Sequence, residues 1–427
     1  MQILLLKNTF FLTLFILISC GNGNTSPNTK GDGENYAFAK ADSTQHKSDD
    51  RKKNASIIVG ANRTSEYVPL LQGKKVGIVT NQSGLIFKTE THRKEESTHI
   101  VDSLLSLHID IKRVYSPEHG FRGDADAGEK VKDGKDPKTG LSIVSLHGKS
   151  KKPTQEQLEG IDVLLFDIQD VGVRFYTYIS TLTYVMEAAA ENGIPVIVLD
   201  RPNPNAHYID GPTLESEHSS FLGMHPIPLV YGMTIGEYAR MVNGERWLTD
   251  GIQCDITVIT LQNWSYTSRY SLPTRPSPNL PNDKSINLYP SLGFFEGTTI
   301  NAGRGTEMQF QIFGSPHLDA TYFPFEYTPQ PNFGAKYPKE KGVVCHGMDL
   351  RDQEYMARVS LEWLIEAYTA HANKEKFFKT ASFTLHAGTK KLQEQIERGY
   401  TFKEIKKGWY ADIDAFKRTR EKYILYN

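Results

Sequence analysis

The stretch Ile161-Asp-Val-Leu-Leu-Phe-Asp-Ile-Gln-Asp170 decides the fold. It opens with a nearly unbroken apolar run, typical of a strand buried on both faces of a parallel sheet, and it ends in polar residues. Residues 176–192 follow with helical spacing and are closed by Gly193, and residues 195–199 form a second apolar run. This order predicts a parallel strand-helix-strand unit.

The same alternation extends from this unit in both directions. Further strands are expected at 75–80, 111–115, 141–146 and 255–260, and further helices at 95–107 and 234–243. We therefore predict an α/β protein with a Rossmann-like, doubly wound parallel sheet over residues 57–300. No GxGxxG or GxxxxGK(S/T) motif follows any strand, so neither a dinucleotide site nor a nucleoside triphosphate site is indicated.

The sequence changes character near residue 272. Residues 272–316 are rich in Pro, Gly and Asn, which predicts long surface loops that border a site. Amphipathic helices are expected at 356–372, 390–398 and 413–422. We place a smaller α+β domain at residues 301–427.

The N-terminal segment has the features of an export signal. Residues 9–18 form an apolar run of signal-peptide length, and Ser19 precedes Cys20 as in a bacterial lipobox. We predict a signal peptide at 1–19, lipidation of Cys20 and a polar tether at 20–56. This places the protein in the cell envelope, anchored to a membrane and facing the periplasm. The alternative is an ordinary secretory signal with an incidental cysteine.

Charge and cysteine content exclude several classes of partner. The 49 Lys and Arg residues nearly balance the 50 Asp and Glu residues, so the chain has no broad basic field for nucleic acid. Cys254 and Cys345 are expected to be two buried thiols rather than a disulfide, and no zinc-ligand spacing occurs.

Polar side chains follow each of the first five predicted strands. Because the carboxyl ends of parallel strands meet at one edge of the sheet, these residues are expected to converge on one crevice. They are Asn81 after the first strand, Glu118 and His119 after the second, His147 after the third, Asp167, Asp170, Arg174 and Tyr176 after the fourth, and Asp200 and Arg201 after the fifth.

Structural explanations exist for most of these residues. Asp167 and Asp170 could cap the following helix or hold loop amides, Asp200 could pair with Arg201, and a histidine such as His147 is more often packed than catalytic. Glu118 is harder to explain in this way, because Pro117 and Gly120 fix a tight loop around it.

Two metal sites remain open as alternatives. The acidic segment 123–129 could bind calcium, although it lacks the EF-hand spacing. A hydrolytic metal centre could use His119, His147, Asp167 and Asp170, although no HExxH motif supports it.

Several strings in the sequence resemble the NamZ-type exo-β-N-acetylmuramidases, and the likeness runs in order from about residue 57 to the end of the chain. The strings are Val79-Thr-Asn-Gln-Ser-Gly84, Tyr115-Ser-Pro-Glu-His-Gly-Phe-Arg-Gly123, Phe166-Asp-Ile-Gln-Asp-Val-Gly-Val-Arg-Phe-Tyr-Thr-Tyr178, Leu199-Asp-Arg-Pro-Asn-Pro204, Ser277-Pro-Asn-Leu-Pro281, Phe295-Glu-Gly-Thr298 and Gly303-Arg-Gly-Thr306. The resemblance implies a Rossmann-like domain, an auxiliary C-terminal domain and a cleft between them. It also implies release of N-acetylmuramic acid from the non-reducing end of peptidoglycan saccharides of the MurNAc-GlcNAc type, without a metal or organic cofactor.

The family's proposed catalytic glutamate matches Glu118. Glycoside hydrolysis needs an acid for the leaving oxygen and usually a second group, for which Asp167, Asp170 and Glu307 are candidates. The lactyl carboxylate of muramic acid needs a cation, for which Arg174, Arg201 and Arg304 are available. Asn81, His119, His147, Asp200 and Glu307 are expected to contact the substrate, and Tyr176 could stack on a sugar ring.

Two other functions share these features. A non-catalytic sugar-binding lipoprotein of the envelope would have the same crevice and tether but would not need Glu118 for binding. A metal-dependent hydrolase would need His and Asp side chains at metal-ligand distances.

Overall fold

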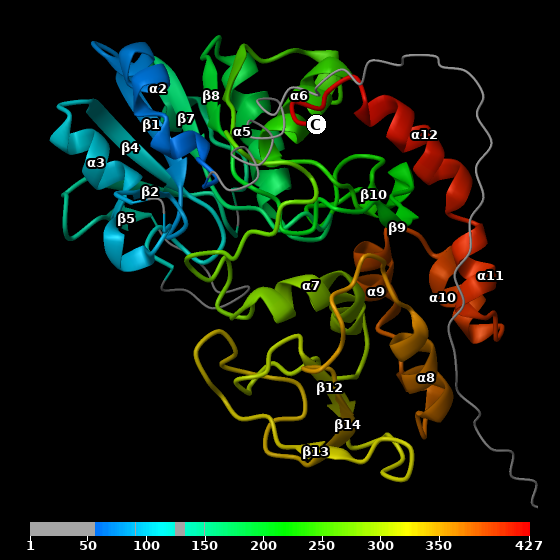
Figure 1. Ribbon diagram of the computed structural model, residues 1–427. Helices are drawn as coiled ribbons and strands as arrows, with labels where there is room; N and C mark the ends of the chain where they lie inside the picture. Colours follow the sequence, from blue (N-terminus) through cyan, green and yellow to red (C-terminus); the bar gives the residue numbers. More distant parts are fainter. Residues whose placement is uncertain (1–55, 90, 124–132, 149) are drawn as a thin grey trace, which may run out of the picture. The chain divides into compact units, whose positions relative to one another are not determined.

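The apolar run in the decisive stretch forms β7 (Val163–Asp167), all of whose residues are buried. It belongs to a seven-stranded sheet with the order β11-β8-β7-β1-β4-β6-β5. The other strands are β1 (Lys75–Thr80), β4 (Asp110–Ser116), β5 (Gly134–Lys135), β6 (Ser142–Ser145), β8 (Val196–Leu199) and β11 (Ile256–Ile259). All neighbours pair in parallel except β5, which runs antiparallel to β6 at one edge (Figure 1).

This computed structural model describes residues 56–89, 91–123, 133–148 and 150–427. The predicted signal peptide, Cys20, nearly all of the predicted tether and nearly all of the acidic segment 123–129 lie outside the described residues. No helix in the described part of the chain is long and apolar enough to cross a membrane.

The order of the strands confirms the predicted doubly wound sheet. From β1 the chain moves outward through β4 to β6, and it then returns to place β7 on the other side of β1, followed by β8 and β11. The direction of winding therefore reverses between β1 and β7. In open α/β sheets, ligands bind beyond the carboxyl ends of the strands at this point.

Successive residues of the strands enter two different cores. Leu164 and Phe166 of β7 pack into one core with α5 (Tyr178–Glu191) and α6 (Ile235–Gly244). Val163 and Leu165 point to the opposite face, where α2 (Thr64–Leu71) and α3 (Ile100–Ser106) pack. Burial on both faces explains why the strands read as continuous apolar runs.

The helix predicted at 95–107 is shorter than expected. Residues 94–96 form a 3₁₀ turn, and Ser97–His99 form β3, which pairs with β2 (Leu85–Phe87). The helix α3 begins only after His99, whose ring Nδ1 accepts a hydrogen bond from the main-chain N–H of Val101. Strand pairing and this cap, which periodicity does not reveal, set the boundary.

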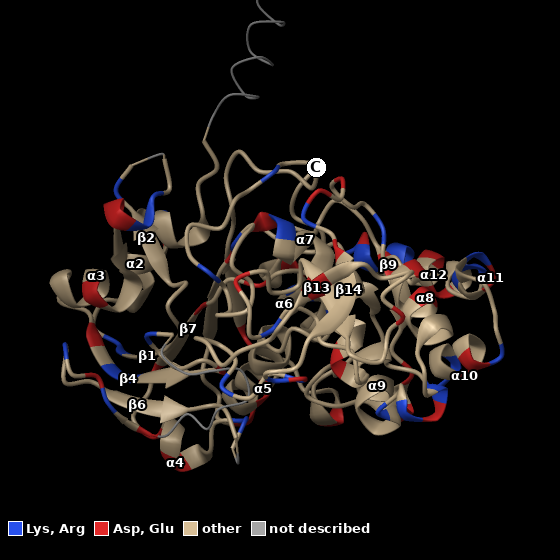
Figure 2. Cartoon of the chain, turned by 90° about the horizontal axis from the view of Figure 1, so that it is seen from below, with Lys and Arg blue, Asp and Glu red and all other residues tan. Residues whose placement is uncertain are grey.

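A smaller α+β region follows the sheet, as predicted. It contains a three-stranded antiparallel sheet with the order β12-β14-β13. Its elements are β12 (Ile312–Ser315), β13 (Phe325–Tyr327), β14 (Cys345–Asp349), α8 (Glu362–Ala370), α9 (Thr380–Ala387), α10 (Lys391–Glu397), α11 (Phe402–Lys407) and α12 (Tyr410–Arg420). Short elements of the first region are α4 (Gln155–Leu158), β9 (Asp210–Thr213) and β10 (Pro228–Val230). Basic and acidic side chains are interspersed along α10, α11 and α12 (Figure 2).

Residues 272–316 are not only loops. They include α7 (Asp283–Leu292), which buries Ile286, Leu288 and Leu292 and is capped by the side chain of Asn282. The sequence conceals this helix because Pro290 lies inside it and its first turn is polar. The helix predicted from residue 356 begins only at Glu362.

The C-terminal residues return to the sheet and are bound there by Asp200. Both oxygens of this buried carboxyl accept hydrogen bonds, Oδ1 from the N–H groups of Arg201 and Gly236, and Oδ2 from the hydroxyls of Thr234 and Tyr426. Burial raises the pKa of Asp200 to about 7. Cys254 and Cys345 are separate buried thiols, as expected.

The raised pKa of Asp200 predicts a loss of stability with rising pH. An unfolded Asp ionises near pH ~3.9, whereas folded Asp200 holds its proton up to about pH 7, so its contribution to stability falls between these values as pH rises. Asp200→Asn keeps the shape and cannot ionise. We expect the urea midpoint to fall less between pH 5 and pH 8 in this variant than in the wild type.

The exposed Asp255 at the start of β11 provides the matched control. Asp255→Asn should keep the wild-type pH dependence. Parallel midpoint curves for the wild type and Asp200→Asn would contradict the assignment.

Candidate active site

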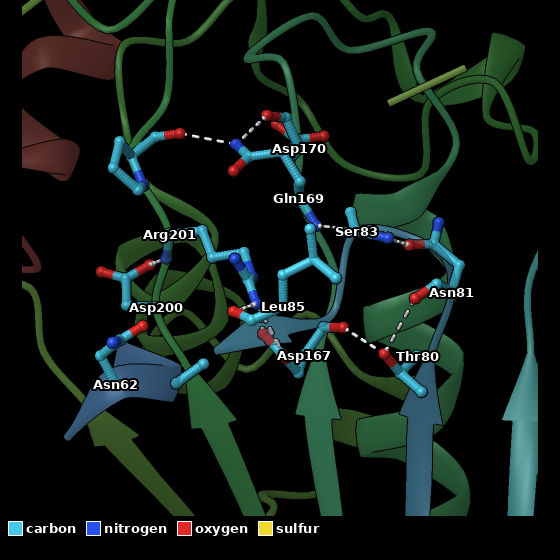
Figure 3. A network of polar contacts seen from close by, with 12 residues as sticks. Asn62, Thr80, Asn81, Ser83, Leu85, Asp167, Gln169, Asp170, Asp200 and Arg201 are labelled. Carbon is cyan, nitrogen blue, oxygen red and sulfur yellow. Dashed lines mark hydrogen bonds and ion pairs between the residues drawn. The ribbon is translucent and has the colours of Figure 1, made fainter. Parts of the chain in front are cut away.

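A network of side chains joins the ends of β1 and β7, where the winding reverses (Figure 3). The hydroxyl of Thr80 donates to the main-chain oxygen of Asp167 over 2.8 Å. Asn81 accepts hydrogen bonds from both the N–H and the hydroxyl of Ser83, and the hydroxyl of Ser83 accepts the N–H of Gln169 at 2.9 Å. Asn81 is fully buried, and its side-chain nitrogen has no partner among the described residues. The side-chain nitrogen of Asn81 is therefore a donor outside this hydrogen-bond network, at the end of β1 where the winding of the sheet reverses.

Asp167 and Arg201 form a buried, two-pronged ion pair in this network. Arg201 Nε donates to Oδ1 at 2.6 Å, and a terminal nitrogen donates to Oδ2 at 2.9 Å. The same terminal nitrogen donates to the main-chain oxygen of Leu85. Although burial opposes it, Asp167 raises the pKa of Arg201. Both side chains are therefore engaged with each other, and the catalytic role predicted for Asp167 and the substrate contact predicted for Arg201 remain predictions. Asp200 is equally engaged, as described above.

Asp170 lies three residues beyond β7 and is less completely satisfied. Its Oδ2 accepts the N–H of Gly172 at 2.7 Å and the hydroxyl of Tyr231. Its Oδ1 is buried and receives no side-chain hydrogen bond within the described residues, while the main-chain N–H groups of Gly172 and Val171 both act to lower the pKa of the carboxyl. Burial raises the pKa of Asp170 to about 6. This carboxyl can therefore exchange a proton near neutral pH.

Glu118 lies in the loop that follows β4. The hydroxyl of Thr177 donates to Glu118 Oε2 at 3.1 Å, and the hydroxyl of Tyr178 lies 3.4 Å from the main-chain oxygen of Glu118. His119 has φ +70° and Gly120 has φ +79°, so the chain reverses tightly just after the glutamate. The side chain of Glu118 is half-buried, whereas His119 is buried. The loop thus presents a partly exposed carboxyl group beyond the carboxyl end of β4.

The residues after α7 bring further charges near Glu118. Arg304 Nε donates to Glu296 Oε1 at 3.0 Å. Burial opposes ionisation of Glu296, but Arg304, Lys339 and His386 lower its pKa to about 2. The negative charges of Glu296 and Glu118 raise the pKa of Arg304, although burial opposes this effect. Glu118 and Arg304 are therefore close enough to interact electrostatically, although they come from different halves of the chain.

Arg174, predicted to contact the substrate, is bonded to main-chain oxygens in the structure. It is fully buried, and its terminal nitrogens donate to the main-chain oxygens of Pro212, Ile227 and Ala387 at 2.6–2.8 Å. Burial without a carboxylate partner lowers its pKa to about 9. The guanidinium group joins β9 to the C-terminal end of α9.

The remaining predicted residues lie at different depths. Tyr176 is buried, donates to the oxygen of Pro276 and packs edge-to-face on Tyr178. His147 is half-buried, and its Nδ1 has no partner among the described residues. Glu307 is exposed and makes no hydrogen bond to the described crevice residues.

Sequence reasoning missed four residues of the crevice. Thr177 contacts Glu118, Tyr231 contacts Asp170, Glu296 binds Arg304, and the charges of Glu118 and Asp170 both act on the hydroxyl of Tyr289. Thr177 and Glu296 stand inside strings that resemble the family, which was a usable signal. Tyr231 and Tyr289 follow or interrupt apolar runs and give no such signal.

Within the described ranges, one trio of side chains is close enough to share a metal ion, namely Glu215, Glu217 and His218. It includes none of His119, His147, Asp167 and Asp170, the residues of the hydrolytic metal hypothesis. Asp167 is neutralised by Arg201, which makes it a poor ligand.

Comparisons with solved structures agree with this architecture. A DUF1343 family protein from Bacteroides fragilis NCTC 9343 is 40% identical, with a TM-score of 0.79 over 87% of this chain and 99% of its own. A second DUF1343 family protein from the same organism is 30% identical, with a TM-score of 0.72 over 88% of this chain and 100% of its own.

Sequence comparisons identify the family. The family model described as exo-β-N-acetylmuramidase NamZ, N-terminal, matches residues 76–284, and the corresponding C-terminal model matches residues 287–426. The peptidoglycan β-N-acetylmuramidase NamZ of Bacillus subtilis (strain 168) is 39% identical over 380 residues, which cover 84% of this chain and 89% of that protein. With its sheet order and both family segments in place, the chain belongs to the NamZ family of exo-β-N-acetylmuramidases.

Proposed function

We propose that this protein is a glycoside hydrolase that releases N-acetylmuramic acid from the non-reducing end of peptidoglycan saccharides, in cell-wall turnover or recycling. The observation that carries the proposal is a half-buried glutamate, Glu118, beyond the carboxyl end of β4 in a member of this family. The relative from Bacillus subtilis is a peptidoglycan β-N-acetylmuramidase by name.

Glu118 acts as the general acid. Protonation of the leaving oxygen requires a carboxyl group that substrate can reach and that is held in one orientation. Glu118 is partly exposed, and Thr177 holds one of its oxygens. Asp167 meets neither condition, because it is inaccessible and bound to Arg201 on both oxygens.

Asp170 is the second carboxyl of the reaction. Its Oδ2 is fixed by Gly172 and Tyr231, while Oδ1 receives no side-chain hydrogen bond within the described residues. A buried oxygen with few donors is costly for a protein to keep, and such groups concentrate at functional sites. With a pKa of about 6, Asp170 is mostly ionised at neutral pH and can stabilise positive charge that develops on the terminal sugar.

Arg304 recognises the lactyl carboxylate of muramic acid. Arg174 uses both terminal nitrogens on main-chain oxygens, and Arg201 uses Nε and one terminal nitrogen on Asp167 and the oxygen of Leu85. Arg304 instead uses Nε on Glu296, and its two terminal nitrogens donate to none of the described residues. Glu296 therefore holds the guanidinium group in place while leaving a two-pronged donor for a carboxylate.

The protein acts as a lipoprotein of the cell envelope. The Ser19-Cys20 boundary and the apolar run before it support an acylated N-terminal cysteine, and the polar residues after it support a tether. A tether would let the enzyme reach saccharides released near the membrane.

Glu118→Gln should lower turnover of the MurNAc-GlcNAc disaccharide by about 10²–10⁴-fold, because the amide keeps the shape but carries no transferable proton. Turnover of a chromogenic N-acetylmuramide with an activated aryl leaving group should fall less, and affinity for N-acetylmuramic acid should be retained. The exposed Glu375→Gln is the control and should match the wild type. A variant that keeps more than about a tenth of the disaccharide turnover would refute the assignment. Activity in neither protein would favour a non-catalytic binding protein.

Arg304→Gln should reduce the preference for N-acetylmuramide over N-acetylglucosaminide substrates by about 10- to 100-fold, the expected worth of a charge-assisted pair. The measurement is kcat/KM for both chromogenic sugars. Arg358→Gln, an exposed arginine in the same half of the chain, should leave the ratio unchanged. An unaltered ratio in Arg304→Gln would assign recognition of the lactyl group to another residue.

Cys20→Ser should move the protein from the membrane fraction to the soluble envelope fraction, because the thiol is the site of acylation. Fractionation followed by immunoblotting measures the distribution. Cys254→Ser removes a buried thiol and should remain with the membrane. Continued membrane association of Cys20→Ser would show that lipidation is not the anchor.

A further inference from the structure

A long loop joins β13 to β14 (Figure 1), and two of its aromatic side chains are exposed. Phe333 is 57% exposed and Tyr337 is 90% exposed. Phe333 lies in a tight turn in which the main chains of Asn332 and Ala335 exchange hydrogen bonds. The aromatic groups are therefore presented to solvent from an internally bonded turn.

The loop is bound to the segment that carries Arg304. The N–H of Gln330 donates to the oxygen of Gly305 at 2.8 Å, and the side-chain amide of Asn332 donates to the oxygen of Thr306 at 2.9 Å. Gly305 has φ +82°, and a Cβ there would lie 2.7 Å from the ring of Pro338. The aromatic loop and the Arg304 segment are thus in direct contact.

A second set of contacts joins the loop to the strand ends. The side-chain amide of Asn279 donates to the oxygen of Gly334 at 2.7 Å. Three residues before Asn279, the oxygen of Pro276 accepts hydrogen bonds from the hydroxyl of Tyr176 and the amide of Gln82, which follows β1. The turn that carries Phe333 is therefore fixed between the two segments that border the crevice.

We propose that Phe333 and Tyr337 form an aromatic rim that binds the pyranose rings on the leaving-group side of the scissile bond. This inference rests on the proposed function. An enzyme that removes the terminal sugar holds that sugar at the deep end of its site, where Asn81 and Asp170 are buried. The rest of the glycan must leave past the exposed border, and exposed aromatic faces suit the apolar faces of sugar rings.

The rim predicts a defined kinetic signature. An aromatic contact of ordinary strength changes affinity by about 2- to 12-fold. The variants Phe333→Ala and Tyr337→Ala should each raise KM for a MurNAc-GlcNAc tetrasaccharide by about that factor, and together by more, with little change in kcat. Hydrolysis of N-acetylmuramoyl fluoride, which occupies only the terminal-sugar position, should remain at the wild-type level. The conservative variant Phe333→Trp keeps an aromatic face and should keep the wild-type KM.

Tyr322→Ala is the matched control, because Tyr322 is 74% exposed in the same half of the chain and makes no hydrogen bond to residues 330–339 within the described part of the chain. An unchanged KM for the tetrasaccharide in the double variant would overturn the rim. Equal losses on the fluoride and the tetrasaccharide would also overturn it, because they would indicate damage to the whole site. Failure of the wild type to hydrolyse either substrate would instead refute the proposed function.

Discussion

The crevice depends on the buried ion pair between Asp167 and Arg201. It joins the end of β7 to the segment after β8. Arg201 also donates to the main-chain oxygen of Leu85, which binds the start of β2 to the same group. Neither charge is solvated, so each requires the other, and loss of one partner from such a pair typically costs about 3–5 kcal/mol. The pair thus fixes three strand ends against one another before any substrate binds.

A second buried cation ties the small α+β region to the sheet. Arg174 lies in the same loop as Asp170, and it donates to main-chain oxygens that include the last carbonyls of α9. Those carbonyls form the negative end of the helix dipole, which partly compensates the missing carboxylate. Lys339 acts in a similar way, with four main-chain oxygens between Phe295 and Ile300 as acceptors. Because these cations are used in the framework, Arg304 is left to face the crevice.

The environment divides the acidic residues of the crevice into different roles. Glu296 lies among three basic groups, which hold its pKa near 2 and keep it ionised as a partner for Arg304. Asp170 has no basic partner, and burial raises its pKa to about 6. The Asp200 carboxyl accepts hydrogen bonds from four donors, and burial raises its pKa to about 7. Such separation of pKa values among similar groups is typical of a site that handles protons and charge.

The sequence by itself determined the doubly wound sheet, the smaller α+β region and the group of polar residues at the strand ends, because apolar periodicity and position after a strand are local properties. The same local information placed Glu118 in a rigid loop. Only the tertiary structure decided which partners bind the three arginines and the two aspartates. Their partners lie 34 residues away for Arg201 and more than 200 away for Arg174 and α9. A side chain's chemical role depends on its partners and burial, and spacing along the chain specifies neither.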